Sequence, residues 1–148
     1  MFKKLFCALL VLCLLGGCAA PAADTNPTAS AGAVTFTDDL GYPVCLDSWD
    51  RVVSLYGSFA ETWLLAGGSL VGTTQDAITE RKLSLGEDVA VVGTVKEPNL
   101  ETILAVAPDF VILSADTANQ LKLHDALTQA GIAHAYYRVD TFDQYLAM

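Results

Sequence analysis

The stretch VVGTVKEPNLETILAVAPDFVILS, residues 91–114, contains one complete unit of the fold. It begins in a short apolar run, passes through a polar loop and enters a segment with helical periodicity that Asn99 is placed to cap. Pro108 ends this helix, because proline disfavours helical backbone in the residue before it. A second apolar run follows at 110–113. The stretch therefore predicts a strand, a helix over 100–106 and a second strand, which together form a βαβ unit of a parallel sheet.

The same alternation continues on both sides of this stretch. Apolar runs predict strands at 52–55, 70–73, 89–92, 110–113 and 133–139, and helices at 59–66, at 117–130 and from Thr141 onward. Ser58 and Glu61 have the spacing of a capping box, whereas residues 75–88 are polar and irregular. Two β-prone runs around Gly41, within 34–46, predict a hairpin. The expected fold class is α/β, a parallel sheet with helices on both faces, preceded by a short β-hairpin.

The first residues have the pattern of an export signal. Lys3 and Lys4 precede an apolar run over 5–15 that is too short to span a bilayer. The run ends in Leu-Gly-Gly-Cys18, which resembles the lipobox of bacterial lipoproteins and implies that Cys18 is lipidated. An ordinary signal peptide with a chance cysteine is the alternative. The expected organisation is a lipoprotein signal peptide at 1–17, a flexible tether at 18–33 and an α/β lobe at 34–148, held at the extracytoplasmic face of the cell membrane by its lipid anchor.

Charge and cysteine content narrow the function classes. The net charge is −9, and without Lys3 and Lys4 six basic residues stand against 17 acidic ones, a net charge of −11. Such an acidic chain is not expected to bind nucleic acid. Of the four cysteines, two lie in the predicted signal and Cys18 is the predicted lipid site. Cys45 is left alone and is expected to pack as a small hydrophobic residue.

Patterns that carry covalent chemistry are missing from the sequence. The glycines within 67–72 enter a predicted strand, which is the reverse of the order in a dinucleotide-binding loop. His124 and His134 lack the spacing of a metal site. We expect His124 on a solvated helix face and His134 at the start of a strand. The chain is therefore not expected to be an enzyme or to hold a cofactor or a metal ion of its own.

The loops that follow the predicted strands offer a binding edge, because ligands of open α/β sheets bind outside the carboxyl ends of the strands. An aromatic ring beside a glycine can lie flat against a ligand, the N–H groups at a helix start favour anions, and basic side chains pair with negative charge. The predicted ligand-binding residues are Tyr56, Gly57, Ser58, Asp76, Lys96, Ser114 and Arg138. The alternative is that each one is an ordinary loop residue.

Four segments, at 51–68, 70–74, 91–114 and 130–146, together resemble the N-terminal lobe of the substrate-binding proteins of ABC importers for iron–siderophore, heme and cobalamin. In that family two α/β lobes are joined by a long helix, and the ligand lies between them. The resemblance implies that the chain is truncated at Met148, before the second lobe. It also implies an ABC permease with its ATPase as partners and a small-molecule metal chelate, of the iron–siderophore type, as ligand.

In the same family each lobe presents a glutamate that pairs with arginines of the permease, and Glu101 matches that position. The alternative role of Glu101 is to complement the helix dipole. Residues 95–97 lack the aromatic that cobalamin binders can place there, and Tyr56-Gly57-Ser58 lacks the histidine of zinc and manganese receptors. A cobalamin or heme receptor, a flavodoxin-like enzyme domain and a surface interaction protein that has lost transport remain the alternative functions.

Overall fold

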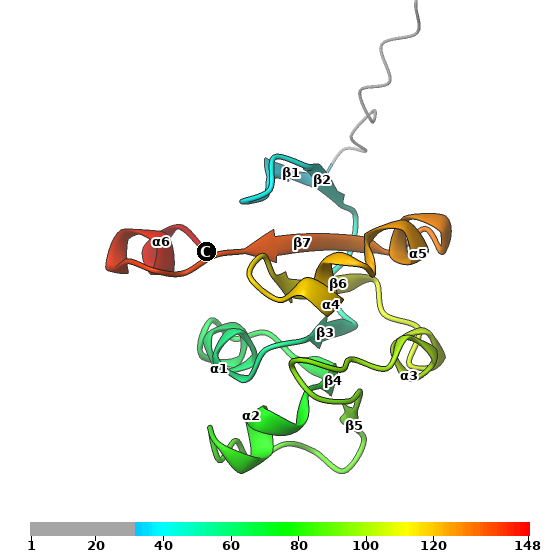
Figure 1. Cartoon of the computed structure of the whole chain (residues 1–148), viewed down its shortest axis with the longest axis vertical. Helices are drawn as coiled ribbons and strands as arrows, with labels where there is room; N and C mark the ends of the chain where they lie inside the picture. Colours follow the sequence, from blue (N-terminus) through cyan, green and yellow to red (C-terminus); the bar gives the residue numbers. More distant parts are fainter. Residues whose placement is uncertain (1–31) are drawn as a thin grey trace, which may run out of the picture.

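The computed structural model describes residues 32–148, so the predicted signal peptide, almost the whole of the predicted tether and Cys18 lie outside the described residues. The strands are β1 (Val34–Thr37), β2 (Pro43–Leu46), β3 (Val52–Ser54), β4 (Leu70–Thr73), β5 (Ala90–Val91), β6 (Phe110–Ser114) and β7 (Ala133–Tyr137). The helices are α1 (Gly57–Leu65), α2 (Gln75–Thr79), α3 (Leu100–Ala105), α4 (Ala118–Leu121), α5 (His124–Gln129) and α6 (Phe142–Ala147) (Figure 1). Within 32–148, every helix falls short of the length and apolar character needed to cross a bilayer.

Strands β3 to β7 form one parallel sheet in the order β5-β4-β3-β6-β7. The first strand of this sheet in the chain, β3, therefore lies in the middle, with β4 on one side and β6 on the other. From β3 the chain adds β4 and then β5 on one side, and it then crosses back to add β6 and β7 on the other side. The order of the strands reverses between β3 and β6, which makes their shared carboxyl ends the topological switch point of the sheet.

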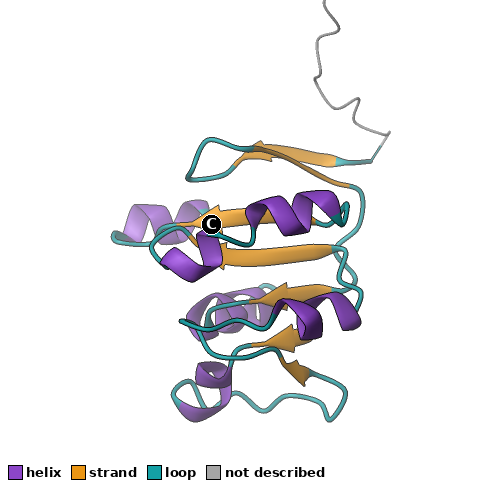
Figure 2. Cartoon of the chain, turned by 45° about the vertical axis from the view of Figure 1, so that its right-hand side comes forward, coloured by secondary structure: helices purple, strands orange, loops and turns teal. Residues whose placement is uncertain are grey.

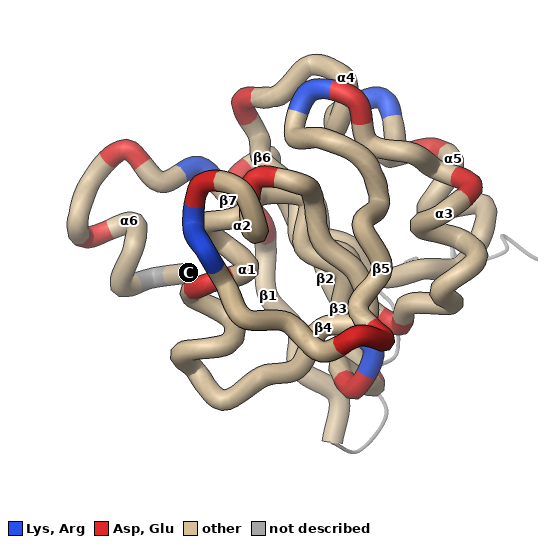
Figure 3. The backbone as a smooth tube through the Cα atoms, turned by 90° about the horizontal axis from the view of Figure 1, so that it is seen from below, with Lys and Arg blue, Asp and Glu red and all other residues tan. Residues whose placement is uncertain are grey.

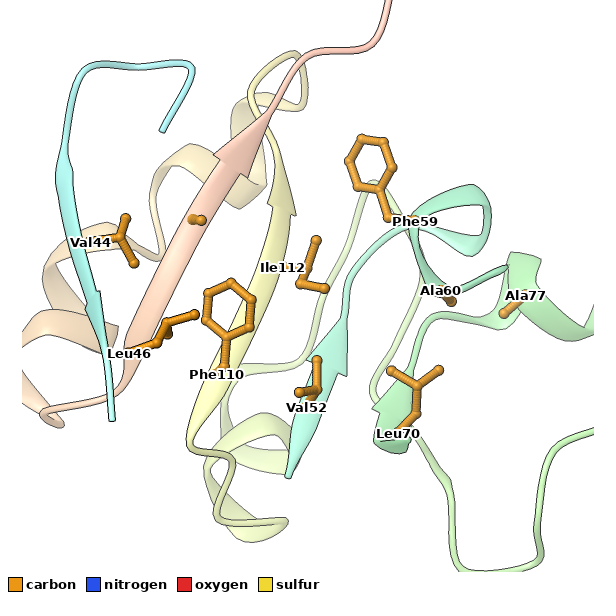
Figure 4. Close-up of a cluster of buried hydrophobic side chains, with 10 residues drawn as sticks. Val44, Leu46, Val52, Phe59, Ala60, Leu70, Ala77, Phe110 and Ile112 are labelled. Atoms are coloured by element: carbon orange, nitrogen blue, oxygen red, sulfur yellow. The ribbon is translucent and has the colours of Figure 1, made fainter. Parts of the chain in front are cut away.

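Both faces of the sheet are covered, as the apolar strands predict. One face packs against α1, α2 and the hairpin, and the other packs against α3 and α5, so that helices lie in front of and behind the strands (Figure 2). Figure 4 shows the first of these two clusters, in which Val44 and Leu46 of β2 lie near Phe110 of β6. The α/β fold with helices on both faces is confirmed.

The hairpin β1–β2 also covers the free edge of β7. The Asp39 N–H donates to the Tyr136 carbonyl over 3.0 Å. The Tyr136 N–H donates to Asp38 Oδ2 over 3.0 Å, and the Arg138 N–H donates to Asp39 Oδ2 over 2.6 Å. These bonds satisfy backbone groups that an edge strand would otherwise leave open to another chain. The predicted hairpin is therefore confirmed, and its turn protects the end of the sheet.

Two segments differ from the sequence expectation. Residues 75–88, expected to be irregular, contain the short helix α2, because Ala77 is fully buried against the start of α1. Residues 117–130, expected to form one helix, form α4 and α5 separated by Lys122 and Leu123. The proposed capping box is also wrong, since α1 begins at Gly57 and its N-cap residue is Tyr56, whose own side chain makes no capping hydrogen bond.

Candidate ligand-binding edge of the sheet

A cavity of about 710 Å³ opens at the carboxyl edge of the sheet, between the loops that follow β3 and β6. The loop after β3 leads to α1 on one face, and the loop after β6 leads to α4 and α5 on the other. The two loops therefore turn to opposite faces of the sheet at the switch point and leave a crevice between them. We call this crevice the edge cavity. Its wall also includes residues of the loop after β5 and of the segment from Tyr137 to Met148.

Four of the predicted ligand-binding residues line the edge cavity. They are Tyr56, Ser58, Lys96 and Ser114. Aromatic rings form much of the wall, with the centroids of Tyr56 and Phe59 5.1 Å apart and those of Phe59 and Tyr137 6.3 Å apart. Burial raises the pKa of Tyr137 to about 12, so its phenol stays protonated at neutral pH and can donate a hydrogen bond. The cavity thus presents flat apolar faces together with a few polar groups, as small-molecule sites do.

Gly57 and Asp76, two of the predicted ligand-binding residues, lie outside the described wall of this cavity. The Gly57 N–H donates to Asp76 Oδ2 over 2.7 Å. The carboxylate of Asp76 therefore already occupies the anion position at the start of α1 that the sequence suggested for a ligand. A Cβ on Gly57 would lie 2.8 Å from the backbone nitrogen of Ala77, so glycine is what lets α1 and α2 approach here.

Arg138 is the third predicted residue that lies outside the described wall. Its Nε donates to Asp116 Oδ1 over 2.8 Å, and this hydrogen bond raises the pKa of the guanidinium above its ordinary value. Asp116 lines the edge cavity, whereas Arg138 is not among the described wall residues. Both side chains are well exposed, so the pair contributes little to stability. Arg138 therefore pairs with an acidic residue of the cavity wall.

The charge of the wall is mixed. Lys96 is its basic residue among those described, and Asp116 and Asp140 are its acidic ones. Acidic positions are spread over most of the chain, with basic positions beside α4, in the view of Figure 3. With Asp116 paired to Arg138, the remaining charged groups of the described wall are the ammonium of Lys96 and the carboxylate of Asp140. The wall therefore offers flat apolar surface together with one positive and one negative group.

Comparison with known proteins agrees with this geometry. No sequence-family profile matches the chain. It is 32% identical over 126 residues to a protein of Bacillus subtilis named as the putative ABC transporter substrate-binding lipoprotein YhfQ, with 80% of this chain and 37% of that protein covered. Among solved structures, the heme binding protein HmuT is 25% identical with a TM-score of 0.62, over 79% of this chain and 38% of that one. The siderophore binding protein BauB is 21% identical with a TM-score of 0.57, over 73% and 38% of the two chains.

The chain has the fold of one lobe of a periplasmic binding protein. It spans a little over a third of the length of the relatives it matches. The resemblance that the sequence suggested is therefore confirmed for the fold and the lobe.

Glu101 lies in the first turn of α3 and is exposed. Asn99 caps this helix as predicted, since its Oδ1 accepts from the Thr102 N–H over 3.1 Å. The loop that leads into α3 also carries Val95 and Lys96 of the edge cavity. The outward carboxylate and the cavity of this lobe are thus joined by one short segment of chain.

The histidines lie together, which the sequence did not indicate. His134 Nε2 is 2.9 Å from His124 Nδ1, and Tyr42 of the hairpin stacks on His124 with a centroid distance of 4.2 Å. His124 is therefore half-buried, and the expectation of a solvated helix face is wrong. Cys45, half-buried with a free thiol, lines the same shallow hollow. In the part of the chain that the structure describes, no group of three or more His, Cys, Asp or Glu side chains is arranged to hold a metal ion.

Sequence reasoning also missed Gln120, whose side chain is fully buried behind the edge cavity loops. A signal was present, because Gln120 precedes the buried Leu123 and Leu127 of the lobe by three and seven residues, the spacing of one helix face. A polar residue at an apolar position predicts a buried amide with specific partners.

Proposed function

We propose that this chain is the N-terminal lobe of the substrate-binding component of an ABC transporter, which captures an iron–siderophore-type chelate outside the cell and delivers it to a membrane permease. The observation that carries the proposal is the edge cavity, which lies at the switch point of a lobe with this fold. The likeness to a putative substrate-binding lipoprotein supports the transport role. The work is reversible binding, with no covalent step and no resident cofactor.

The composition of the wall supports the ligand class. Tyr56, Phe59 and Tyr137 offer aromatic faces to a flat ligand, and Lys96 offers a positive charge to carboxylate or catecholate oxygens. Ferric catecholate siderophores combine flat catechol rings with a net negative charge. Heme, which also joins a flat ring system to carboxylates, is the second candidate, because HmuT is described as a heme binding protein and is 25% identical to this chain.

A direct binding test uses the full-length product of the gene and the quenching of its tryptophan fluorescence. The probes are a ferric catecholate siderophore, a ferric hydroxamate siderophore, hemin and cyanocobalamin. We expect saturable quenching by one iron chelate with a dissociation constant of about 1 μM or lower. Failure of every probe to bind, together with a copurifying flavin or turnover of ester substrates, would instead support an enzyme.

Delivery to the permease is proposed to depend on Glu101, and attachment to the membrane on Cys18. The exposed carboxylate of Glu101, in the first turn of α3, suits a basic partner. Glu101→Arg in the full-length protein should abolish uptake of the iron chelate by cells, while ligand affinity stays at the wild-type value. Glu97→Arg, on the neighbouring loop, is the matched control. Uptake that is unchanged in Glu101→Arg would refute the docking role.

A further inference from the structure

Gln120 joins three separate loops through one buried side chain. Its Oε1 accepts from the Ser114 N–H over 2.7 Å at the end of β6. Its Nε2 donates to the carbonyl of Leu55, after β3, over 2.8 Å and to the carbonyl of Val95, after β5, over 2.9 Å. The residue is fully buried, so water does not compete for these bonds. A single amide thus uses its oxygen and both of its N–H groups to connect the three loops around the edge cavity.

The neighbouring residue of α4 holds the same loop. Asn119 Nδ2 donates to the Lys96 carbonyl over 2.8 Å, so Asn119 and Gln120 bind the consecutive carbonyls of Lys96 and Val95. Lys122 Nζ donates in turn to Asn119 Oδ1 over 2.9 Å. We call Asn119 and Gln120 the α4 clamp. The clamp holds the backbone of Val95 and Lys96, and Lys96 carries the basic group of the cavity wall.

The clamp itself is attached to the core. The Tyr136 hydroxyl, on the central part of β7, donates to the backbone carbonyl of Gln120 over 3.2 Å. Burial raises the pKa of Tyr136 to about 12, so this hydroxyl remains a donor throughout the neutral range. Tyr136 is fully buried among the apolar residues that α3 and α5 cover. The α4 clamp therefore has a rigid support on the side away from the loops.

The loop after β5 needs such support because the sheet gives it little. β5 is a two-residue strand at the edge of the sheet and pairs with β4 at Ala90 and Val91. Beyond it, the loop folds on itself, with a bridge between Gly93 and Pro98 and a turn closed by Thr94. The Gln75 N–H donates to the Gly93 carbonyl over 2.9 Å, which ties the start of the loop to the β4 side of the sheet. The α4 clamp adds the bonds that tie Val95 and Lys96 to the β3 and β6 side.

The geometry points to Gln120 as a positioning residue of the ligand site, which sets where Lys96 and Ser114 stand relative to Tyr56 on the cavity wall. The inference rests on the proposed function, since it concerns the same cavity. Gln120 acts through the backbone of the loops and does not line the cavity among the described residues. Because its hydrogen bonds hold the loops in place before a ligand arrives, the loops lose little conformational entropy when the ligand binds.

The test compares Gln120→Met, which keeps the length of the side chain and removes its donors and its amide oxygen, with wild type in the full-length protein. The matched control is Leu127→Ala, a buried change on α5 that weakens the core without touching the three loops. Hydrogen exchange of the amides of 94–97 and of Ser114 should rise in Gln120→Met and stay as in wild type in Leu127→Ala. The affinity for the ferric siderophore bound by wild type should fall about tenfold or more in Gln120→Met alone.

Asn119→Ala provides a second variant if Gln120→Met does not fold. Asn119 is exposed, and this change removes only its hydrogen bond to the Lys96 carbonyl from the three clamp bonds to the loops after β3 and β5. It should raise exchange in 94–97 and weaken affinity by roughly threefold, as expected for the loss of one hydrogen bond. The inference is overturned if exchange and affinity stay at wild-type values in either clamp variant that folds, or if Leu127→Ala changes both as much. If wild type binds none of the probes, the proposed function fails, whereas the exchange measurement still decides whether the clamp holds the loops.

Discussion

Two stretches of the same carboxyl edge behave in opposite ways. After β4 the edge is closed, because Asp76 accepts from the Gly57 N–H and α2 packs directly on the start of α1. Between β3 and β6 the edge is open and holds a cavity of about 710 Å³. Both stretches contain polar residues at strand ends, so residue type does not separate them. The difference lies in the topology. The loops that leave β3 and β6 turn to opposite faces of the sheet, whereas the loops after β3 and β4 lead to helices that pack on the same face.

The largest effect should come from opening the closed stretch. Asp76→Ala leaves the buried Gly57 N–H without its acceptor, which should lower the free energy of unfolding by about 2 kcal/mol. Affinity for the iron chelate should stay the same, because Asp76 does not line the edge cavity among the described residues. Urea denaturation and a ligand titration measure the two quantities. Asp76→Asn, which keeps an oxygen acceptor, is the control and should lose much less stability.

The open stretch should respond in the reverse way. Lys96→Ala should weaken binding of an anionic ferric siderophore by about tenfold, about 1.4 kcal/mol, and leave the urea midpoint unchanged, because Lys96 is exposed on the cavity wall. The loss should shrink at high salt, where the charge is screened in both proteins. Lys82→Gln, a change at an exposed lysine outside the described cavity wall and outside the α4 clamp, is the control. Equal loss in the two variants would mean that only the general charge of the protein matters.

The sequence predicted the sheet and its helices well, because their signals are local. The apolar runs and the Asn99 cap depend on a few neighbouring residues, and the structure confirms them, whereas the Ser58 cap was wrong. The closed stretch could not be predicted, since it depends on Asp76 meeting Gly57 across 19 positions of the chain. The helical spacing of Gln120 marks a buried position but does not name its partners, two of which, Leu55 and Val95, lie 65 and 25 positions away.

The candidate site was predicted only in part, because the position of a residue at a strand end is a local signal, whereas its tertiary partners are not. Strand-end position alone selected Tyr56, Ser58, Lys96 and Ser114 correctly as residues of one edge. It also selected Arg138, whose side chain turns instead to Asp116. Which strand ends face an opening and which are used internally follows from pairing between distant elements. That information lies in the tertiary contacts, and the roles of all these residues in binding a ligand stay predictions.

The smallest effect concerns a region remote from the edge cavity. Burial lowers the pKa of His134 below its ordinary value, with a smaller contribution from His124 in the same direction and opposing ones from Ile132 and Asp38. The unfolded chain therefore binds a proton more readily than the folded one, so stability should fall as the pH drops below about 6.5 and be level above it. His134→Gln should reduce this dependence, as measured by urea midpoints at about pH 7.5 and about pH 5. The same slope in both proteins would contradict the assignment.

The most direct test of the account locates the ligand on the lobe. In the ¹⁵N-labelled full-length protein, a bound ferric siderophore broadens the amide signals of nearby residues because the iron is paramagnetic, and the gallium form of the same siderophore serves as the diamagnetic control. If the edge cavity binds the chelate, broadening should centre on residues 56–58, 95–96, 114–118 and 137–140. Broadening centred on the hairpin at 34–46 or on the closed stretch at 74–77, with the edge cavity signals intact, would contradict the account.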